Sequence, residues 1–116
     1  MKNFSIEAKN LESSNAALIR TTGSINSNSS PALDDQFDDL ISQGKHTIVV
    51  DLANTEFINS SGLGVLLGRV ASLREEGGDL IMMNVPRLIA DIFDILGIKS
   101  HFRIIASVDE LKVATE

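Results

Sequence analysis

The spacing of apolar residues along the chain predicts an alternation of strands and helices. Residues 4–8 alternate between apolar and polar side chains, as in a strand with one solvated face. Residues 16–21 predict a second strand, which the short connection makes antiparallel to the first. Residues 47–52 and 80–83 are nearly continuous apolar runs, typical of strands covered on both faces, and residues 103–106 predict a last strand.

The first predicted helix follows the second strand. Ser30 suits the N-cap, Pro31 the first helical position and Gly44 the C-terminal end. Helical spacing places four apolar residues on one face: Leu33, Phe37, Leu40 and Ile41. The other face is acidic and contains Asp34, Asp35, Asp38 and Asp39. A solvated face is the favoured interpretation of these acids, and an electrostatic contact with a basic partner is the alternative.

Three further helices complete the pattern. Residues 60–61 open a helix that ends near Gly77, and residues 87–96 form the next. The apolar positions of this next helix are Leu88, Ile89, Ile92, Phe93 and Leu96. Residues 107–110 have the chemistry of a capping box and begin a C-terminal helix. The order β-β-α-β-α-β-α-β-α predicts an α/β fold, an open and mainly parallel sheet with one antiparallel edge, in a single domain over residues 1–116.

Composition narrows the classes of function. The net charge of −6 argues against nucleic-acid binding and against adhesion to anionic membranes. The chain has no cysteine, and neither His46 nor His101 lies in a metal-binding motif, so we expect no metal and no cofactor. It has no apolar run long enough to cross a bilayer and no secretory signal pattern, so we expect a cytoplasmic protein without membrane insertion. No catalytic triad or phosphate-binding glycine loop is present, so we do not expect an enzyme.

Functional residues in such sheets collect at the carboxyl ends of the strands. Right-handed crossovers bring the loops after parallel strands to one edge. We therefore expect residues 23–30, 53–61 and 84–87 to gather there. The middle loop belongs to the most informative stretch of the chain, residues 51–68.

In that stretch the chain turns from an extended segment into a helix. Phe57 and Ile58 are expected to bury the extended segment. Ser60, Ser61 and Gly62 then form the turn, where a hydroxyl lies beside free backbone N–H groups and the positive end of the helix dipole. A phosphate would be tolerated there. From spacing alone, the favoured interpretation is that a serine caps the helix and the glycine eases the turn, and phosphorylation is the alternative.

The following helix carries a stripe of small residues beside its buried face. The stripe contains Ser61, Gly64, Gly68, Ala71 and Ser72. Each glycine inside a helix costs about 1 kcal/mol relative to alanine, so this spacing indicates close approach by another element. Tight packing within the chain and contact with a partner explain the stripe equally well. Val65, beside the stripe and outside the main buried face, is a candidate for partner contact.

Residues 57–67, FINSSGLGVLL, resemble the signature of the bacterial STAS-domain anti-sigma-factor antagonists. The resemblance implies that the unphosphorylated chain binds an anti-sigma factor, which releases a sigma factor, and that phosphorylation of Ser60 blocks this binding. Ser61 is the alternative acceptor. The anti-sigma factor is commonly also the serine kinase, and a separate serine phosphatase resets the switch. The expected partner-binding residues are Asn26, Asn59, Ser61, Gly62, Gly64, Val65 and Gly68.

Two positions depart from the family pattern. The residue before the phosphorylated serine is typically aspartate, and here it is Asn59; the loop after the second strand often carries aspartate where this chain has Asn26. Losing two carboxylates favours an added phosphate, because like charges repel, but it leaves the identity of the kinase open. The alternative function is a STAS subunit of a transporter, a lipid-trafficking complex or a sensory assembly.

Overall fold

The computed structural model describes residues 3–11 and 15–110. Five strands and three α-helices follow one another in the predicted order. They are β1 (Ser5–Asn10), β2 (Ala16–Ile25), α1 (Ser30–Ser42), β3 (Thr47–Ile58), α2 (Ser60–Glu75), β4 (Asp79–Met83), α3 (Arg87–Leu96) and β5 (Arg103–Ile105). A 3-10 turn, η1 (Lys99–His101), precedes β5. Residues 108–110 are helical, and the rest of the predicted C-terminal helix lies outside the described residues.

The five strands form one sheet whose spatial order is the chain order, β1-β2-β3-β4-β5. β1 pairs with β2 antiparallel, and the other three pairs are parallel. The mainly parallel α/β fold with one antiparallel edge is thus confirmed.

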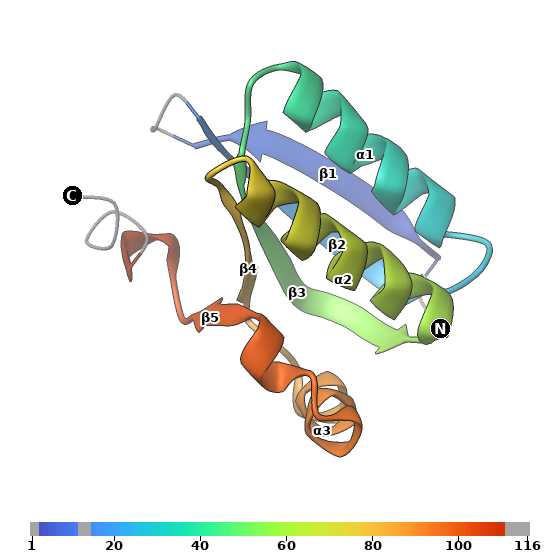
Figure 1. Cartoon of the computed structure of the whole chain (residues 1–116). Coiled ribbons are helices and arrows are strands. Elements are labelled where there is room, and N and C mark those ends of the chain that lie inside the picture. Colours follow the sequence, from blue (N-terminus) through green and yellow to red (C-terminus); the bar gives the residue numbers. More distant parts are fainter. Residues whose placement is uncertain (1–2, 12–14, 111–116) are drawn as a thin grey trace.

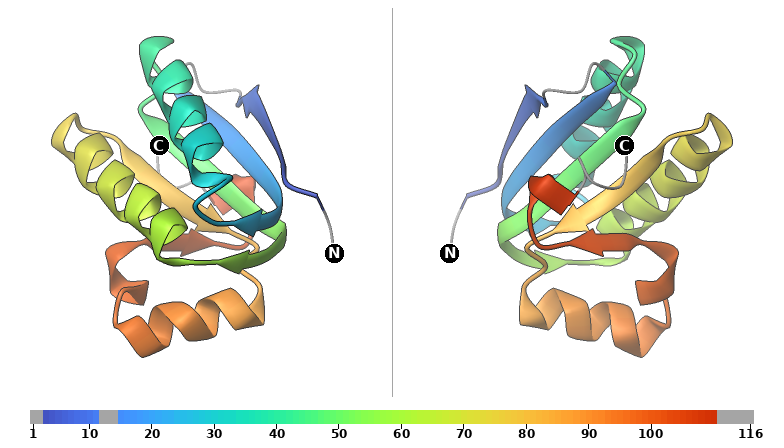
Figure 2. Two further views of the ribbon diagram at one scale, coloured as in Figure 1. Left: turned by 90° about the vertical axis from the view of Figure 1, so that its right-hand side faces the viewer. Right: turned by 90° about the vertical axis from the view of Figure 1, so that its left-hand side faces the viewer.

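Helices α1 and α2 lie side by side on one face of the sheet (Figures 1 and 2), while α3 lies beyond the end of β4, next to β5. The main core lies between the sheet and α1 and α2. Its fully buried large side chains include Ile19, Leu33, Phe37, Val50, Leu66 and Leu73. A smaller apolar cluster covers the opposite face of the sheet: Ala16, Leu18, Val49, Ile81, Met83 and Ile105. Strands β2 to β4 are therefore apolar on both faces, which explains their continuous apolar runs.

The central strands β2 and β3 run past the segments that the apolar pattern predicted. Their pairing continues to Ile25 and Ile58 through two register irregularities, although the added residues include several polar and exposed ones. The last partner of β4 is Asp51, so residues 52–58 of β3 continue without β4. Backbone pairing with β2 holds this extension, and such pairing leaves no signal in side-chain polarity.

Two details of the predicted elements are wrong, and the burial of α3 is a finding of the structure. The N-cap of α1 is Ser29, and Ser30 is already helical. Phe57 is 44% exposed, because the extended strand turns it away from the core. In α3 only Ile89 and Phe93 are buried; Leu88 and Leu96 are more than half exposed because α3 lies at the end of the sheet and packs along a narrow stripe.

Candidate functional site

A single residue, Asn59, connects the end of β3 to the start of α2. Its side-chain oxygen Oδ1 accepts hydrogen bonds from the backbone N–H groups of Ser61 and Gly62, at 3.0 and 3.2 Å. Asn59 is therefore the N-cap of α2, and the interpretation that a serine caps this helix is wrong. Ser60, the first residue of the helix, is exposed.

The loop after β2 repeats this arrangement. Oδ1 of Asn26 accepts hydrogen bonds from the N–H groups of Asn28 and Ser29, at 2.9 and 3.2 Å. The N–H of Asn59 donates to the carbonyl oxygen of Ile25 at 3.0 Å, which joins the ends of β2 and β3. Asn26, Asn59 and Phe57 consequently line one hollow of about 600 Å³ beside the start of α2.

The third loop does not join the other two. Because β4 ends at the level of Asp51, residues 84–87 begin well before the end of β3. There, Nδ2 of Asn84 donates to Oδ1 of Asp51 at 3.1 Å. The prediction that three loops gather at one edge holds for two of them and is wrong for the third, because β4 ends at the level of Asp51 whereas β3 continues to Ile58.

Asp51 is a buried carboxylate at the point where β4 ends. Its two oxygens accept hydrogen bonds from Nε of Arg20 and N–H of Ala53, both at 3.0 Å, as well as from Asn84. Burial alone would raise the pKa of Asp51. The hydrogen bonds and the charge of Arg20 outweigh burial and hold the pKa below its ordinary value, so the carboxylate is charged at neutral pH.

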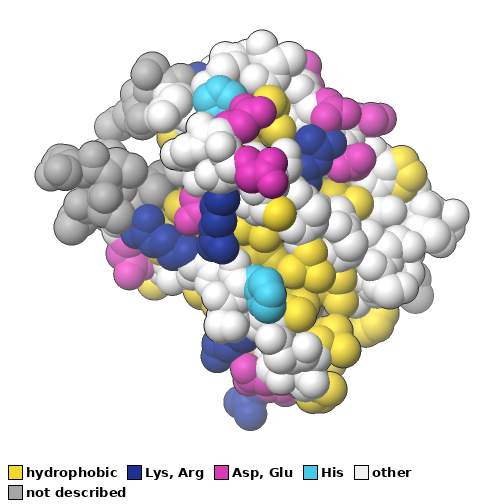
Figure 3. All heavy atoms as spheres, viewed as in Figure 1, with side chains coloured by type: hydrophobic (Ala, Val, Ile, Leu, Met, Phe, Trp, Pro, Cys, Tyr) yellow, Lys and Arg dark blue, Asp and Glu magenta, His cyan; other side chains and the backbone are white. Residues whose placement is uncertain are grey.

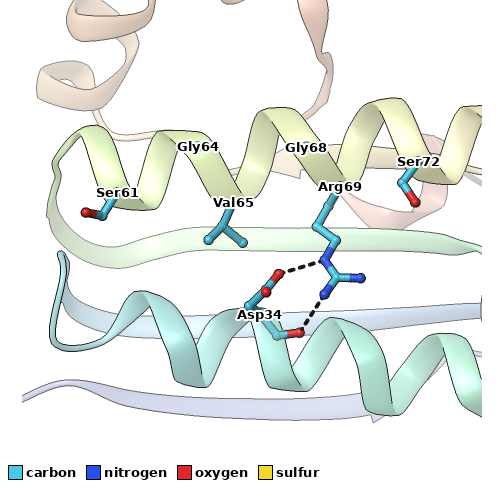
Figure 4. A pocket seen from close by; sticks show the side chains of 7 residues that line it. All are labelled: Asp34, Ser61, Gly64, Val65, Gly68, Arg69 and Ser72. Atoms are coloured by element: carbon cyan, nitrogen blue, oxygen red, sulfur yellow. Dashed lines mark hydrogen bonds and ion pairs between the residues drawn. The ribbon is translucent and has the colours of Figure 1, made fainter.

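A groove of about 530 Å³ runs between α1 and α2, and we call it the α1–α2 groove (Figure 4). Its lining residues are Asp34, Ser61, Gly64, Val65, Gly68, Arg69 and Ser72. At Gly64 and Gly68, a Cβ atom would meet no described atom within 4 Å. The two glycines of the stripe therefore do not serve close packing within the described part of the chain. Ala71 is exposed but lies outside the lining.

Gly62 belongs to the packing and not to the groove. A Cβ at this buried position would lie 2.6 Å from Cγ2 of Ile25 and 2.9 Å from Cγ2 of Ile58. Only glycine lets the first turn of α2 rest on the ends of β2 and β3. The residues that we expected to contact a partner therefore fall into three groups. The groove is lined by Ser61, Gly64, Val65 and Gly68, and the adjacent hollow by Asn26 and Asn59. Gly62 is buried beneath the first turn of α2.

An ion-pair cluster spans the groove from Arg69 of α2 to Asp34 of α1, and sequence reasoning missed it. Nε of Arg69 donates to Oδ1 of Asp34 at 2.8 Å, and its Nη2 donates to Oδ1 of Asp38 at 2.7 Å. Burial would lower the pKa of Arg69, but the two aspartates raise it. Acidic side chains surround a basic one over α1 and α2 in Figure 3. Two of the four acids of α1 are thus paired within the chain, and only their spacing of one helical turn could have indicated this.

No group of three or more acidic, histidine or cysteine side chains in residues 3–11 and 15–110 could hold a metal ion. None of the helices described is long and apolar enough to cross a membrane.

Comparison with known proteins assigns the family. The model of the STAS domain matches residues 7–111. The anti-sigma F factor antagonist of Paenibacillus polymyxa is 32% identical over 102 residues, which cover 85% of this chain and 84% of that protein. The anti-sigma-B factor antagonist of Bacillus subtilis is 29% identical over 97 residues, 84% of this chain and 86% of the relative.

A solved structure agrees in fold. The unphosphorylated form of the anti-sigma factor antagonist SpoIIAA superimposes with a TM-score of 0.77 at 21% identity, over 97% of this chain and 96% of that one. Its match extends over the sheet, the helices and the β3–α2 junction alike, since nearly the whole chain is covered. The family model spans most of the sequence, and the Paenibacillus relative is similar in sequence over most of both chains. This chain therefore belongs to the STAS-domain family.

Proposed function

We propose that this chain is an anti-sigma-factor antagonist that is regulated by phosphorylation of Ser60. In its unphosphorylated form it binds an anti-sigma factor across the start of α2 and the α1–α2 groove, which releases a sigma factor. The observation that carries the proposal is an exposed hydroxyl at the first residue of α2, next to a groove with open glycine positions. The names of the two relatives support the same function.

Phosphorylation switches binding by occupying the interface. A phosphoserine adds nearly two negative charges and considerable bulk. At Ser60 it lies beside the positive end of the helix dipole, and the neighbouring N-cap is a neutral amide, so the fold tolerates it. A partner seated against α2 would have to bury this charge without a counter-charge, which is costly.

The remaining partners follow from the family resemblance. The anti-sigma factor is also the serine kinase, a separate serine phosphatase restores the active form, and the exchange takes place in the cytoplasm. The supporting feature is the exposure of Ser60, because a kinase and a phosphatase must both reach its hydroxyl.

The modification can be tested directly. Incubation with the anti-sigma factor encoded by the same genome and ATP should add one phosphate at Ser60, located by peptide mass spectrometry. Phosphorylated protein should bind at least about tenfold more weakly than unmodified protein, and Ser60→Asp should weaken binding less, since a carboxylate carries less charge. Wild-type levels of phosphate in Ser60→Ala would move the site to Ser61, and equal binding by all forms would end the proposal.

The surface can be tested with a matched pair of variants. Gly64→Leu fills the groove and should fold normally, because no described atom lies near its Cβ position, but it should bind poorly. Ala71→Leu adds a similar side chain to the same helix outside the groove and should bind like wild type. Circular dichroism checks the fold and calorimetric titration the affinity. A Gly64→Leu variant that folds and binds normally would place the interface elsewhere.

A further inference from the structure

Helix α3 carries an apolar stripe that the described part of the chain leaves largely uncovered. The buried side chains of this helix are Ile89 and Phe93. Four other apolar residues follow the spacing i, i+4, i+7 and i+8, which places them on one side of α3, and we call them the α3 stripe: Leu88, Ile92, Ile95 and Leu96. Leu88 and Leu96 are 54% and 55% exposed, and Ile95 is 83% exposed. Exposed apolar patches on soluble proteins mark interaction sites, whereas apolar residues scattered singly do not.

The α3 stripe continues towards the start of α2. Leu67 of α2 and Ile92 of α3 are both partly buried against the main core. Leu67 follows Val65, which lines the α1–α2 groove, by two residues or about 200° around the helix, so Leu67 is on the side of α2 away from α1. Helix α3 lies on that side of α2 (Figures 1 and 2), and hydrophobic side chains gather between the two helices in Figure 3. Ser60 precedes Leu67 by two helical turns and therefore lies at the end of the same side of α2.

The charged residues around the stripe are paired within the chain. Nε of Arg87 lies 3.2 Å from Oδ1 of Asp91, and Nζ of Lys99 lies 3.9 Å from Oδ1 of Asp94. A molecule that covers the stripe therefore meets balanced charges and needs no counter-charge of its own, which favours an apolar contact surface. The net charge of the whole chain, −6, disfavours both a second copy of the chain and an anionic membrane as the occupant.

The size of the stripe also bears on what covers it. A stable interface covers about 800 Å² on each partner, contributed by about 20–30 residues. A stripe of this kind on a helix of 10 residues is too small for such an interface, so a dimer held by α3 against α3 would be weak. The stripe is large enough to form one end of a wider contact. The surface next to it is the start of α2, where the proposed function places the anti-sigma factor.

We infer that the anti-sigma factor extends its contact from the start of α2 across Leu67 to the α3 stripe and covers the stripe with apolar side chains of its own. This inference rests on the proposed function and names a second part of the surface that the same partner uses. A phosphate on Ser60 then lies between the α1–α2 groove and the α3 stripe, inside the contact and not at its rim. One added group at this position interrupts the whole interface, because the partner would have to bury its charge.

Two substitutions of one residue test the inference. Ile95→Gln removes apolar surface from the stripe, and Ile95→Leu keeps it. Both variants should fold like wild type, because Ile95 is 83% exposed, and circular dichroism checks this. Calorimetric titration with the anti-sigma factor encoded by the same genome should show about tenfold weaker binding by Ile95→Gln and a change within about twofold for Ile95→Leu. The weakening should be the same at low and high salt, because the substitution removes no charge.

The contrary outcomes are equally clear. Wild-type affinity of Ile95→Gln would exclude the stripe from the interface, and equal weakening by Ile95→Leu would show that the partner does not read its apolar character; each overturns the inference. If Ile95→Gln does not fold, the comparison of Leu88→Gln with Leu88→Met decides in the same way. A wild-type dimer in sedimentation that Ile95→Gln dissociates would assign the stripe to self-association. If wild type binds and phosphorylation at Ser60 prevents binding, the proposed function stands whichever way Ile95→Gln behaves, whereas no binding by wild type ends the proposed function and this inference with it.

Discussion

Asn59 caps α2 without bringing a negative charge. Aspartate, the typical residue of the family at this position, would cap the helix and add a charge. Oδ1 of Asn59 accepts two backbone N–H groups of α2, as an aspartate oxygen would, since both residues are good N-caps. Its remaining polar group is a neutral amide donor and not a second anionic oxygen. The start of α2 is thereby capped without charge next to the proposed phosphorylation site.

The variant Asn59→Asp should separate capping from charge. Before phosphorylation it should be as stable as wild type or more stable by about 0.5 kcal/mol, because a carboxylate at a helix N-terminus is favourable. After phosphorylation at Ser60 it should be less stable than phosphorylated wild type by about 0.5–1 kcal/mol, because two anions then lie side by side. Urea unfolding of the four species measures both differences. Equal stability of the two phosphorylated species would show that the phosphate points away from residue 59.

At the scale of single residues, the sequence predicted that α2 begins at Ser60 or Ser61 but not which side chains surround that turn. The turn of two serines and a glycine before an apolar helix indicated where a phosphate would be tolerated. Which residue caps the helix depends on how far β3 extends, and this extension is held by backbone pairing with β2. The partners of Arg69 depend on how α1 and α2 pack, and the spacing of Asp34 and Asp38 by one helical turn is the only local sign of it.

The glycines of α2 divide the helix into a packed start and an open middle. Gly62 touches the ends of β2 and β3, whereas Gly64 and Gly68 face the α1–α2 groove. The same residue type therefore serves two purposes within two turns of one helix.

Alanine substitution should change the stability in opposite directions at the two kinds of position. Gly62→Ala should destabilise the protein by about 1–2 kcal/mol, because the added methyl overpacks against Ile25 and Ile58. Gly68→Ala should stabilise it by about 0.5–1 kcal/mol, because alanine is the better helix former and open space receives the methyl. Urea unfolding measures both. A loss of stability in Gly68→Ala would mean that this face of α2 packs against something within the chain.

Most elements could be predicted because their apolar residues follow the period of the structure that they form. The bounds of α3 were predicted to the residue, and its end at Gly97 reflects a left-handed backbone conformation that glycine adopts easily. The burial of α3 could not be predicted, because an apolar side chain at helical spacing is buried only where a neighbour covers it. That depends on the position of α3 at the end of the sheet.

Across the whole molecule, Asp51 links three strands. It binds Arg20 of β2 and its own strand at Ala53, and through Asn84 it holds the chain where β4 ends. Its lowered pKa means that the folded state favours the charged carboxylate. The resulting stability is fully present above the unfolded pKa of about 3.9 and is lost as the pH falls through the lower folded pKa.

The variant Asp51→Asn should therefore be destabilised in a pH-dependent way. At pH 7 it should lose about 1–3 kcal/mol, because a charged partner of several hydrogen bonds is removed. The difference from wild type should shrink below about pH 4, where the wild-type carboxylate becomes protonated in the unfolded state and then in the folded state. Urea unfolding across this pH range gives the comparison. A difference that stays constant with pH would show that shape, and not charge, explains the contribution of Asp51.

The strand order has a consequence for how the chain folds during synthesis. Because the strands are neighbours in the same order as they occur in the sequence, each strand that leaves the ribosome finds its partner already made. No later strand has to be inserted between two strands that have already paired. Each pairing therefore closes only a short length of chain, and we expect folding to be fast for a parallel sheet. Ser60 begins the helix that follows β3, so we expect its turn to form once the first three strands have paired and before β4 is complete.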